Sequence, residues 1–135
     1  ESRIDSVAGY RNQLDAIRPQ VQSEAIEAYR QRVDELARTA GVEVDHDRIA
    51  QETVLLVEKS DVAEELTRLA IHVEAVRKTL AGSEPAGKKL DFLSQEMLRE
   101  VNTIGQKSRA TAIRTLVIEL KTEVERIREQ VQNVE

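Results

Sequence analysis

Residues 91–107 read DFLSQEMLREVNTIGQK, and their apolar side chains recur every three or four positions. This spacing matches the 3.6-residue period of an α-helix and predicts one buried stripe along it. The stripe consists of Leu93, Met97, Val101 and Ile104. Around it stand acidic, basic and amide side chains of several kinds, whereas a solvated helix face needs only Glu and Lys. The stretch therefore predicts both a packed helix and a functional polar surface.

The composition favours long helices throughout the chain of 135 residues. It is 40% hydrophobic and 33% charged, with one Phe, two Tyr and no Trp, which is poor for a β-sandwich. Without Cys, the chain can form neither disulfides nor thiolate metal sites. No run of 18 uncharged apolar residues and no signal peptide is present, so we expect a cytoplasmic protein.

Five helices account for nearly all of the sequence, over about residues 3–40, 48–59, 60–81, 88–107 and 110–135. Pro19 predicts a kink or a break near Arg18, because proline lacks the amide donor. Asp45 or Asp47 is expected to cap the second helix, and Ser60 or Asp61 the third. Gly41 is the expected stop of the first helix, and residues 42–47 form an acidic loop.

Two of these helices carry heptad-like seams with spacings of four and three. The third helix has Val62, Leu66, Leu69, Val73, Val76 and Leu80. The fifth has Ile113, Val117, Leu120, Val124, Ile127, Val131 and Val134. Such seams indicate antiparallel packing or a coiled coil. The predicted fold class is all-α: an elongated helical bundle or an antiparallel coiled-coil hairpin of about five helices.

The opening residues, ESRIDSVAGY, resemble the middle of an amphipathic helix that has no cap. They predict that residues 1–135 belong to a longer protein, and the resemblance described below implies that they form its single C-terminal helical domain. Charge is uneven: residues 1–87 hold 11 Lys and Arg against 17 Asp and Glu, a net of −6. Residues 88–135 hold 9 against 8, so an anionic partner would favour this last third.

Glu96 and Glu100 lie one helical turn apart, which stacks two like charges on one flank of the stripe. A divalent cation, Mg²⁺ or Mn²⁺, would relieve their repulsion, because both ions prefer oxygen ligands. The alternative is a solvated face on which Arg99 and Lys107 screen the pair. His72, beside the seam of the third helix, is either a general acid or base or a structural residue.

Amides accompany the charges on the fourth helix and at the end of the fifth. Asn and Gln contribute little to an electrostatic surface, but they orient hydrogen bonds to phosphate, sugar and base edges. The alternative is polar decoration of a coiled coil. The residues in question are Gln95, Asn102, Gln130, Gln132 and Asn133, with Arg128 among them.

Two motifs resemble the C-terminal region of the YicC/YloC family of bacterial proteins. One is DFLSQEMLREVNTIGQK at residues 91–107, and the other is ERIREQVQNVE at residues 125–135. DVAEELTRLAIHVE, at residues 61–74, is similar to a third segment of that family. Gln106 and Val101 depart from the usual pattern, which has Ser and a small or polar residue there.

The resemblance implies an endoribonuclease that cleaves RNA with a divalent metal and assembles into a homo-oligomer, a hexamer in the full-length family. On that basis His72, Glu96 and Glu100 would be catalytic, with Glu96 and Glu100 holding the metal. RNA would contact Gln95, Arg99, Asn102, Lys107, Arg128, Gln130, Gln132 and Asn133. The alternative is a helical oligomerisation and RNA-docking module without its own catalytic centre. A third possibility is a coiled-coil interaction domain that does not bind RNA.

Overall fold

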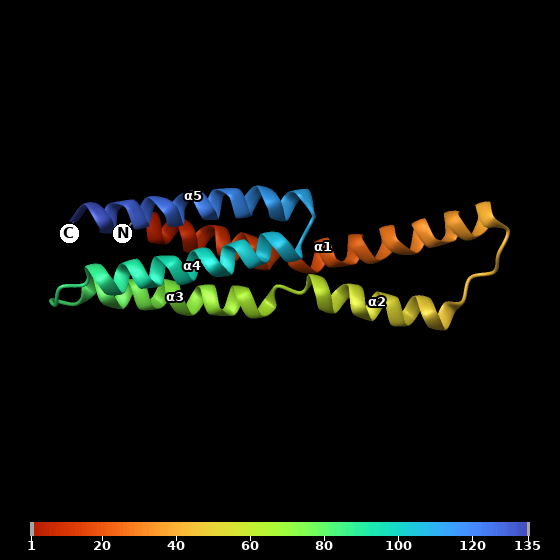
Figure 1. Ribbon diagram of the computed structural model, residues 1–135, viewed down its shortest axis with the longest axis horizontal. Coiled ribbons are helices and arrows are strands. Elements are labelled where there is room, and N and C mark those ends of the chain that lie inside the picture. Colours follow the sequence, from red (N-terminus) through yellow and green to blue (C-terminus); the bar gives the residue numbers. More distant parts are fainter. Residues whose placement is uncertain (1, 135) are drawn as a thin grey trace.

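The computed structural model describes the backbone of residues 2–134 and the side chains of residues 3–133. It is all-α, as predicted, with five helices and no strand in this range. They are α1 (Ser2–Ala40), α2 (His46–Ser60), α3 (Ala63–Ala81), α4 (Gly87–Lys107) and α5 (Thr111–Val134). Figure 1 shows an elongated molecule in which a bundle continues into a hairpin of two helices. Glu135, which ends the second family motif, lies outside the described residues.

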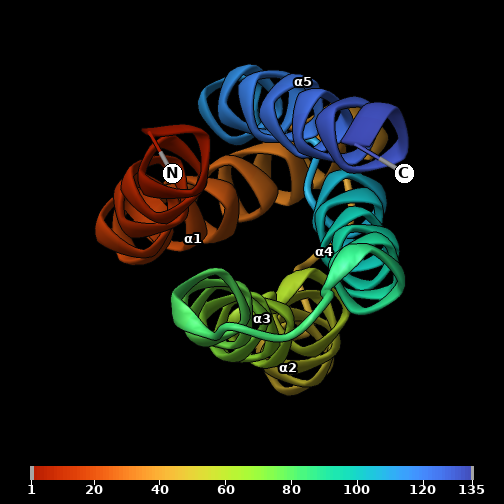
Figure 2. The same cartoon turned by 90° about the vertical axis from the view of Figure 1, so that its left-hand side faces the viewer.

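The bundle is built from the first half of α1 together with α3, α4 and α5. Viewed end-on, these helices surround the core in the order α1, α3, α4, α5, and each contacts its two neighbours (Figure 2). The two predicted seams and the α4 stripe all point into this core. Leu80 is the exception, since it is 48% exposed near the end of α3. The side chain of Val134 is outside the described range.

The hairpin comprises the second half of α1 and all of α2 (Figure 1). None of the α2 side chains is buried, and Leu36, Val42, Val54 and Leu55 are exposed. Gly41 ends α1 as predicted, with a positive φ of 69° that glycine adopts without strain. The amides of Gly41 and Val42 donate to the carbonyls of Arg38 and Ala37, which satisfies the helix end.

Three local predictions change in the structure. The break at Pro19 is not observed, because α1 runs unbroken through it with the proline ring exposed. His46 is the first residue of α2 rather than part of the loop, since Asp45 caps the helix by accepting from the Arg48 amide at 3.2 Å. Asp61 accepts from the Ala63 amide at the start of α3, although Val62 occupies the cap position.

Helices α4 and α5 approach each other closely at Gly105. A Cβ added there would lie 3.2 Å from Cγ1 of Val117, so a larger residue would require the Val117 side chain to shift. On the same interface Met97, Val101, Ile104 and Leu120 are fully buried. The close approach and the apolar stripe together fix how α4 and α5 sit against each other.

We predict that Leu120→Ala lowers the free energy of unfolding by about 2–5 kcal/mol, because it removes buried side-chain atoms and leaves a cavity. Ile118→Ala, on the same helix but 64% exposed, should change it by less than about 0.5 kcal/mol. Urea unfolding followed by circular dichroism measures both. Equal losses in the two variants would contradict the assigned core.

Candidate functional site

Five charged side chains form a cluster between α3 and α4, which we call the α3–α4 cluster. Nε of Arg68 donates to both carboxylate oxygens of Glu100 at 3.1 Å, and Nη1 lies 2.8 Å from Glu64. Nζ of Lys107 lies 2.8 Å from Oε2 of Glu65. These contacts join the two helices at two levels and set their register.

Burial makes the partners in this cluster necessary. Glu65 is 3% exposed and Glu100 is 7% exposed, and a buried carboxylate without a partner is strongly unfavourable. The hydrogen bond with Glu100 is the main reason that the pKa of Arg68 is raised above its usual value. Arg68 is therefore paired with Glu100 and Lys107 with Glu65, so the cluster stabilises the α3–α4 interface.

The cluster engages one of the two predicted metal ligands. Both oxygens of Glu100 accept from Arg68, whereas Glu96 has only a contact at 3.8 Å with Arg99. Within the described part of the chain, no group of three or more His, Asp or Glu side chains could hold a metal ion. A guanidinium thus occupies the position beside Glu100 that the metal prediction requires, and this donor set does not fit a metal centre as arranged. The metal remains a prediction from the family resemblance.

His72 lies at the level of Glu96 in the same interface. The antiparallel register pairs Arg68 with Glu100, and one turn further along α3 is His72, while one turn back along α4 is Glu96. Both side chains are half-buried, so each keeps contact with solvent. The helices therefore bring two of the three predicted catalytic residues to one level, and the third pairs with Arg68.

A shallow groove of about 430 Å³ runs along the other flank of α4, between α4 and α5. We call it the α4–α5 groove. Its lining includes four of the eight residues predicted to bind RNA: Gln95, Arg99, Asn102 and Arg128. Leu98, Thr103 and Gln106 complete the lining. A polar set separated by up to 33 positions in the sequence thus shares one surface.

The arginines of the groove are loosely held. Arg99 is 75% exposed and lies 3.8 Å from its nearest carboxylate, on Glu96. Nε of Arg128 is 3.6 Å from Oδ1 of Asp91, and neither atom forms a hydrogen bond, although both are buried. Asp91 instead accepts from the Gln95 amide at 2.9 Å. Arg99 therefore presents exposed N–H donors to an anionic ligand, whereas Nε of Arg128 is buried against Asp91.

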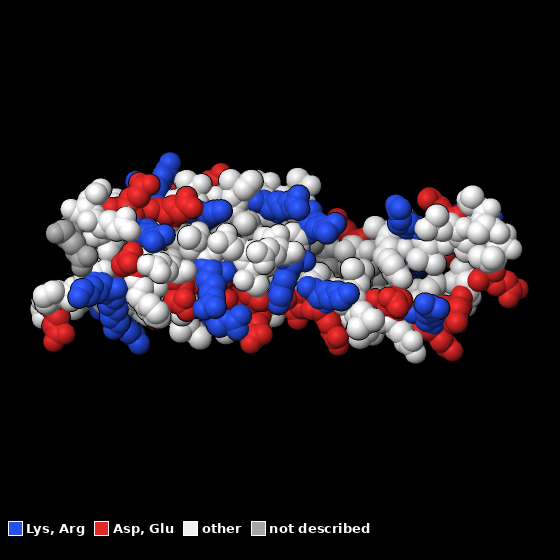
Figure 3. All heavy atoms as spheres, in the orientation of Figure 1, with Lys and Arg blue, Asp and Glu red and all other residues white. Residues whose placement is uncertain are grey.

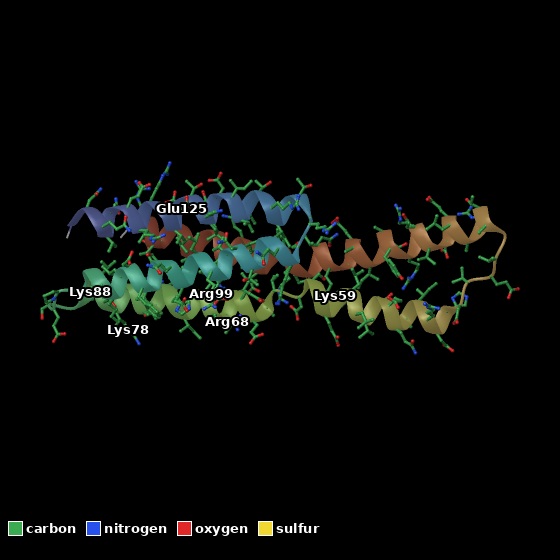
Figure 4. All side chains as sticks on the ribbon, in the orientation of Figure 1. Lys59, Arg68, Lys78, Lys88, Arg99 and Glu125 are labelled. Carbon is green, nitrogen blue, oxygen red and sulfur yellow. The ribbon has the colours of Figure 1, made fainter. Side chains whose placement is uncertain are left out.

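The other four predicted RNA contacts lie elsewhere. Lys107 belongs to the α3–α4 cluster, and its Nζ also lies 3.3 Å from the Asp61 carbonyl oxygen. Gln130, Gln132 and Asn133 are exposed near the end of α5 and do not line the groove. Figure 4 shows Arg68 and Arg99 on adjacent helices in the middle of one face.

No role was predicted for Glu65 and Arg68, although both belong to the family-like segment of residues 61–74. Their signal was weak, because Glu and Arg three positions apart are ordinary on a solvated helix. Only the register between α3 and α4 shows that Glu65 points inward.

A family model described as "Endoribonuclease YicC-like, C-terminal" matches residues 14–135. The chain belongs to this family. A protein of Clostridioides difficile strain 630, described as "Probable endoribonuclease YicC", is 42% identical over 117 residues, covering 84% of this chain and 40% of that protein. A Haemophilus influenzae protein of the same description is 38% identical over 135 residues, covering 100% of this chain and 46% of the relative.

These matches confirm the resemblance drawn from the YicC-like motifs. The chain spans less than half the length of both relatives. In the part of the chain that the structure describes, no helix is long and apolar enough to cross a membrane.

We predict that Lys107→Met lowers the free energy of unfolding by about 3 kcal/mol, because it leaves the buried Glu65 with only Arg68 at 3.8 Å. The double variant Glu65→Leu/Lys107→Met should be more stable than the single one, since no buried charge remains unpaired. Denaturant unfolding of the two, with Lys88→Met as an exposed control, tests the pairing. A double variant that is less stable than Lys107→Met would contradict it.

Proposed function

We propose that this chain provides the RNA-docking surface of an endoribonuclease. The observation that carries the proposal is the α4–α5 groove, which collects Gln95, Arg99, Asn102 and Arg128. Membership of a YicC-like endoribonuclease family names RNA as the ligand class. The proposal assigns a surface to the alternative of an RNA-docking module. Where cleavage takes place is tested separately.

The groove residues suit a nucleic-acid backbone. Arg presents several N–H donors in a planar fork that matches phosphate oxygens, so Arg99 and Arg128 would take phosphates. Gln95 and Asn102 offer both donors and acceptors for sugar and base edges. Aromatic side chains are few in the whole sequence, so backbone contacts carry more of the binding than stacking does.

Charge on the surrounding surface agrees with this choice of face. Figure 3 shows Lys and Arg side chains along the length of α4, on the face that also carries Lys59 and Lys88 (Figure 4). The first 87 residues have a net charge of −6, so most of their surface repels RNA, whereas Lys59 adds a cation to the face of α4. An RNA strand would therefore follow α4.

We predict that Arg99→Gln/Arg128→Gln weakens binding of a labelled single-stranded RNA and flattens its salt dependence. Each lost phosphate contact should reduce the slope of log K against log salt by about 0.7, so two should reduce it by about 1.4. Fluorescence anisotropy between 50 and 200 mM salt, roughly the range over which such slopes are resolved, measures this. 

The matched control is Arg77→Gln, which removes an arginine that faces Asp5 of α1. It should leave both affinity and slope unchanged. Equal effects of the groove variant and the control would contradict the proposed surface.

A second candidate function is cleavage within these helices, and the shared level of His72 and Glu96 favours it. An imidazole beside a carboxylate can take a proton from the attacking oxygen or give one to the leaving oxygen. The resemblance adds a divalent metal, Mn²⁺ or Mg²⁺, which would stabilise charge on the phosphoryl oxygens when bound. Because Glu100 is engaged by Arg68, no step is assigned to that residue.

We predict that, if the chemistry lies here, His72→Ala slows single-turnover cleavage of the labelled RNA by about 100-fold and leaves RNA affinity unchanged. His46→Ala is the control, because it removes the other histidine of the chain, at the start of α2. Reactions with Mn²⁺, with Mg²⁺ and with EDTA, repeated on Glu96→Gln and Glu100→Gln, test the metal. Undiminished cleavage by His72→Ala would contradict the catalytic assignment, and undiminished cleavage in EDTA would contradict the metal.

We also propose self-association through the hairpin of α1 and α2. Leu36, Val54 and Leu55 are 59%, 56% and 46% exposed there. Apolar side chains gathered on an exposed element favour association with another surface. Sedimentation analysis of the protein with these residues changed to Ser tests whether the predicted oligomer depends on them.

A further inference from the structure

A pocket of about 780 Å³ lies where the bundle meets the hairpin, and we call it the junction pocket. Residues 17–25 of α1 form one wall, and the end of α2 with the α2–α3 connection forms another. The α4–α5 connection and the first residues of α5 close the third side. Its volume falls within the roughly 300–1,000 Å³ of typical small-molecule sites.

The interior of the junction pocket is apolar, with Ile17, Val21, Leu56, Val62 and Ile113 in its lining. These side chains come from four separate segments, and Val62 and Ile113 are also part of the bundle core. Such a lining favours the flat face of an uncharged ring over a charged group.

Four cations and two carboxylates, those of Glu24 and Asp61, line this pocket around its apolar interior. Lys59 and Arg109 line the pocket, are exposed, and form no hydrogen bond or ion pair among the described residues. Lys107 and Arg18 also line it, the first held by Glu65 and the second near Asp61 at 3.6 Å. Two free cations beside an apolar cavity are suited to a ligand with a phosphate next to an aromatic ring.

The pocket adjoins the surface proposed to carry RNA. Lys107 belongs both to its lining and to the α3–α4 cluster, one helical turn beyond Thr103 of the α4–α5 groove. Lys59 lies on the same face as Arg99 and Arg68 (Figure 4). A strand that follows α4 toward its C-terminal end therefore arrives at the pocket.

We propose that the junction pocket receives one unstacked base of a single-stranded RNA, with Lys59 and Arg109 on the phosphates beside that base. This inference rests on the RNA-docking role proposed above. The apolar walls take the base face, as bases removed from a helix commonly insert between apolar side chains or against Arg planes. Duplex RNA keeps its bases stacked inside the helix, so the pocket selects single strands.

The test fills the pocket without changing its charge. Ala25 lines the pocket from α1 and is exposed, so Ala25→Trp should occupy the cavity while α1 stays folded. Ala28→Trp is the matched control, because Ala28 is exposed on the same helix and does not line the pocket. A second variant, Lys59→Gln/Arg109→Gln, removes the free cations instead. Circular dichroism checks that each variant is folded.

Two readouts are measured on the purified protein. One is the affinity for a single-stranded RNA and for a duplex of the same length. The other is the fluorescence of 2-aminopurine within the single strand, which rises when that base is unstacked. We expect Ala25→Trp to weaken single-strand binding by about fivefold or more and to abolish the fluorescence rise. Duplex binding, and both readouts for Ala28→Trp, should not change.

Unchanged single-strand affinity and an undiminished fluorescence rise in Ala25→Trp would overturn the pocket assignment. Loss of duplex and single-strand binding to the same extent in the folded variant would also overturn it, since the pocket would then not select single strands. The docking proposal fails in a different way: the parent protein would not bind RNA, or Arg99→Gln/Arg128→Gln would bind as well as the parent. If Ala25→Trp has no effect but Arg99→Gln/Arg128→Gln still weakens RNA binding, the base pocket is ruled out and the docking surface is not.

Discussion

The α3–α4 interface depends on two buried carboxylates that each require a cation from the other helix. Apolar seams favour helix packing but tolerate small shifts in register, because successive Leu and Val side chains in a seam have similar shapes. Glu65 and Glu100 do not tolerate such a shift, since each would lose its partner and remain buried. The ion pairs therefore select one register, and this register places His72 and Glu96 at the same level of the two helices.

The same register sets what each flank of α4 can do. One flank faces α3, where charges are paired and buried, and the other faces α5, where Arg99 is 75% exposed beside Arg128. Under the docking proposal, stability and ligand binding are thus divided between two sides of one helix. A plain Glu and Lys surface would serve neither purpose, because burial needs matched geometry and RNA needs amide and guanidinium groups. This division accounts for the varied polar side chains of residues 91–107.

Helix positions and most of the core could be predicted because apolar spacing is a local property. The stripe of α4 is buried throughout, as predicted, whereas Leu80 shows that spacing alone does not say where neighbouring helices end. The partner of Glu100 could not be predicted in the same way, because Arg68 is 32 positions away and the contact exists only in one register. Groove residues were predicted one by one from chemistry and from family resemblance. That four of them meet in one groove depends on α4 and α5 packing closely at Gly105.

The uninterrupted course of α1 has a mechanical consequence. A helix of 39 residues is about 58 Å long at 1.5 Å per residue, and here its two halves belong to different parts of the molecule. Because α1 is one continuous helix across Pro19, a displacement of its outer tip near Gly41 is passed along a single element to the inner half, which packs against α3 and α5. Under the self-association proposed for the hairpin, contacts made near Gly41 would therefore reach the bundle through this one helix.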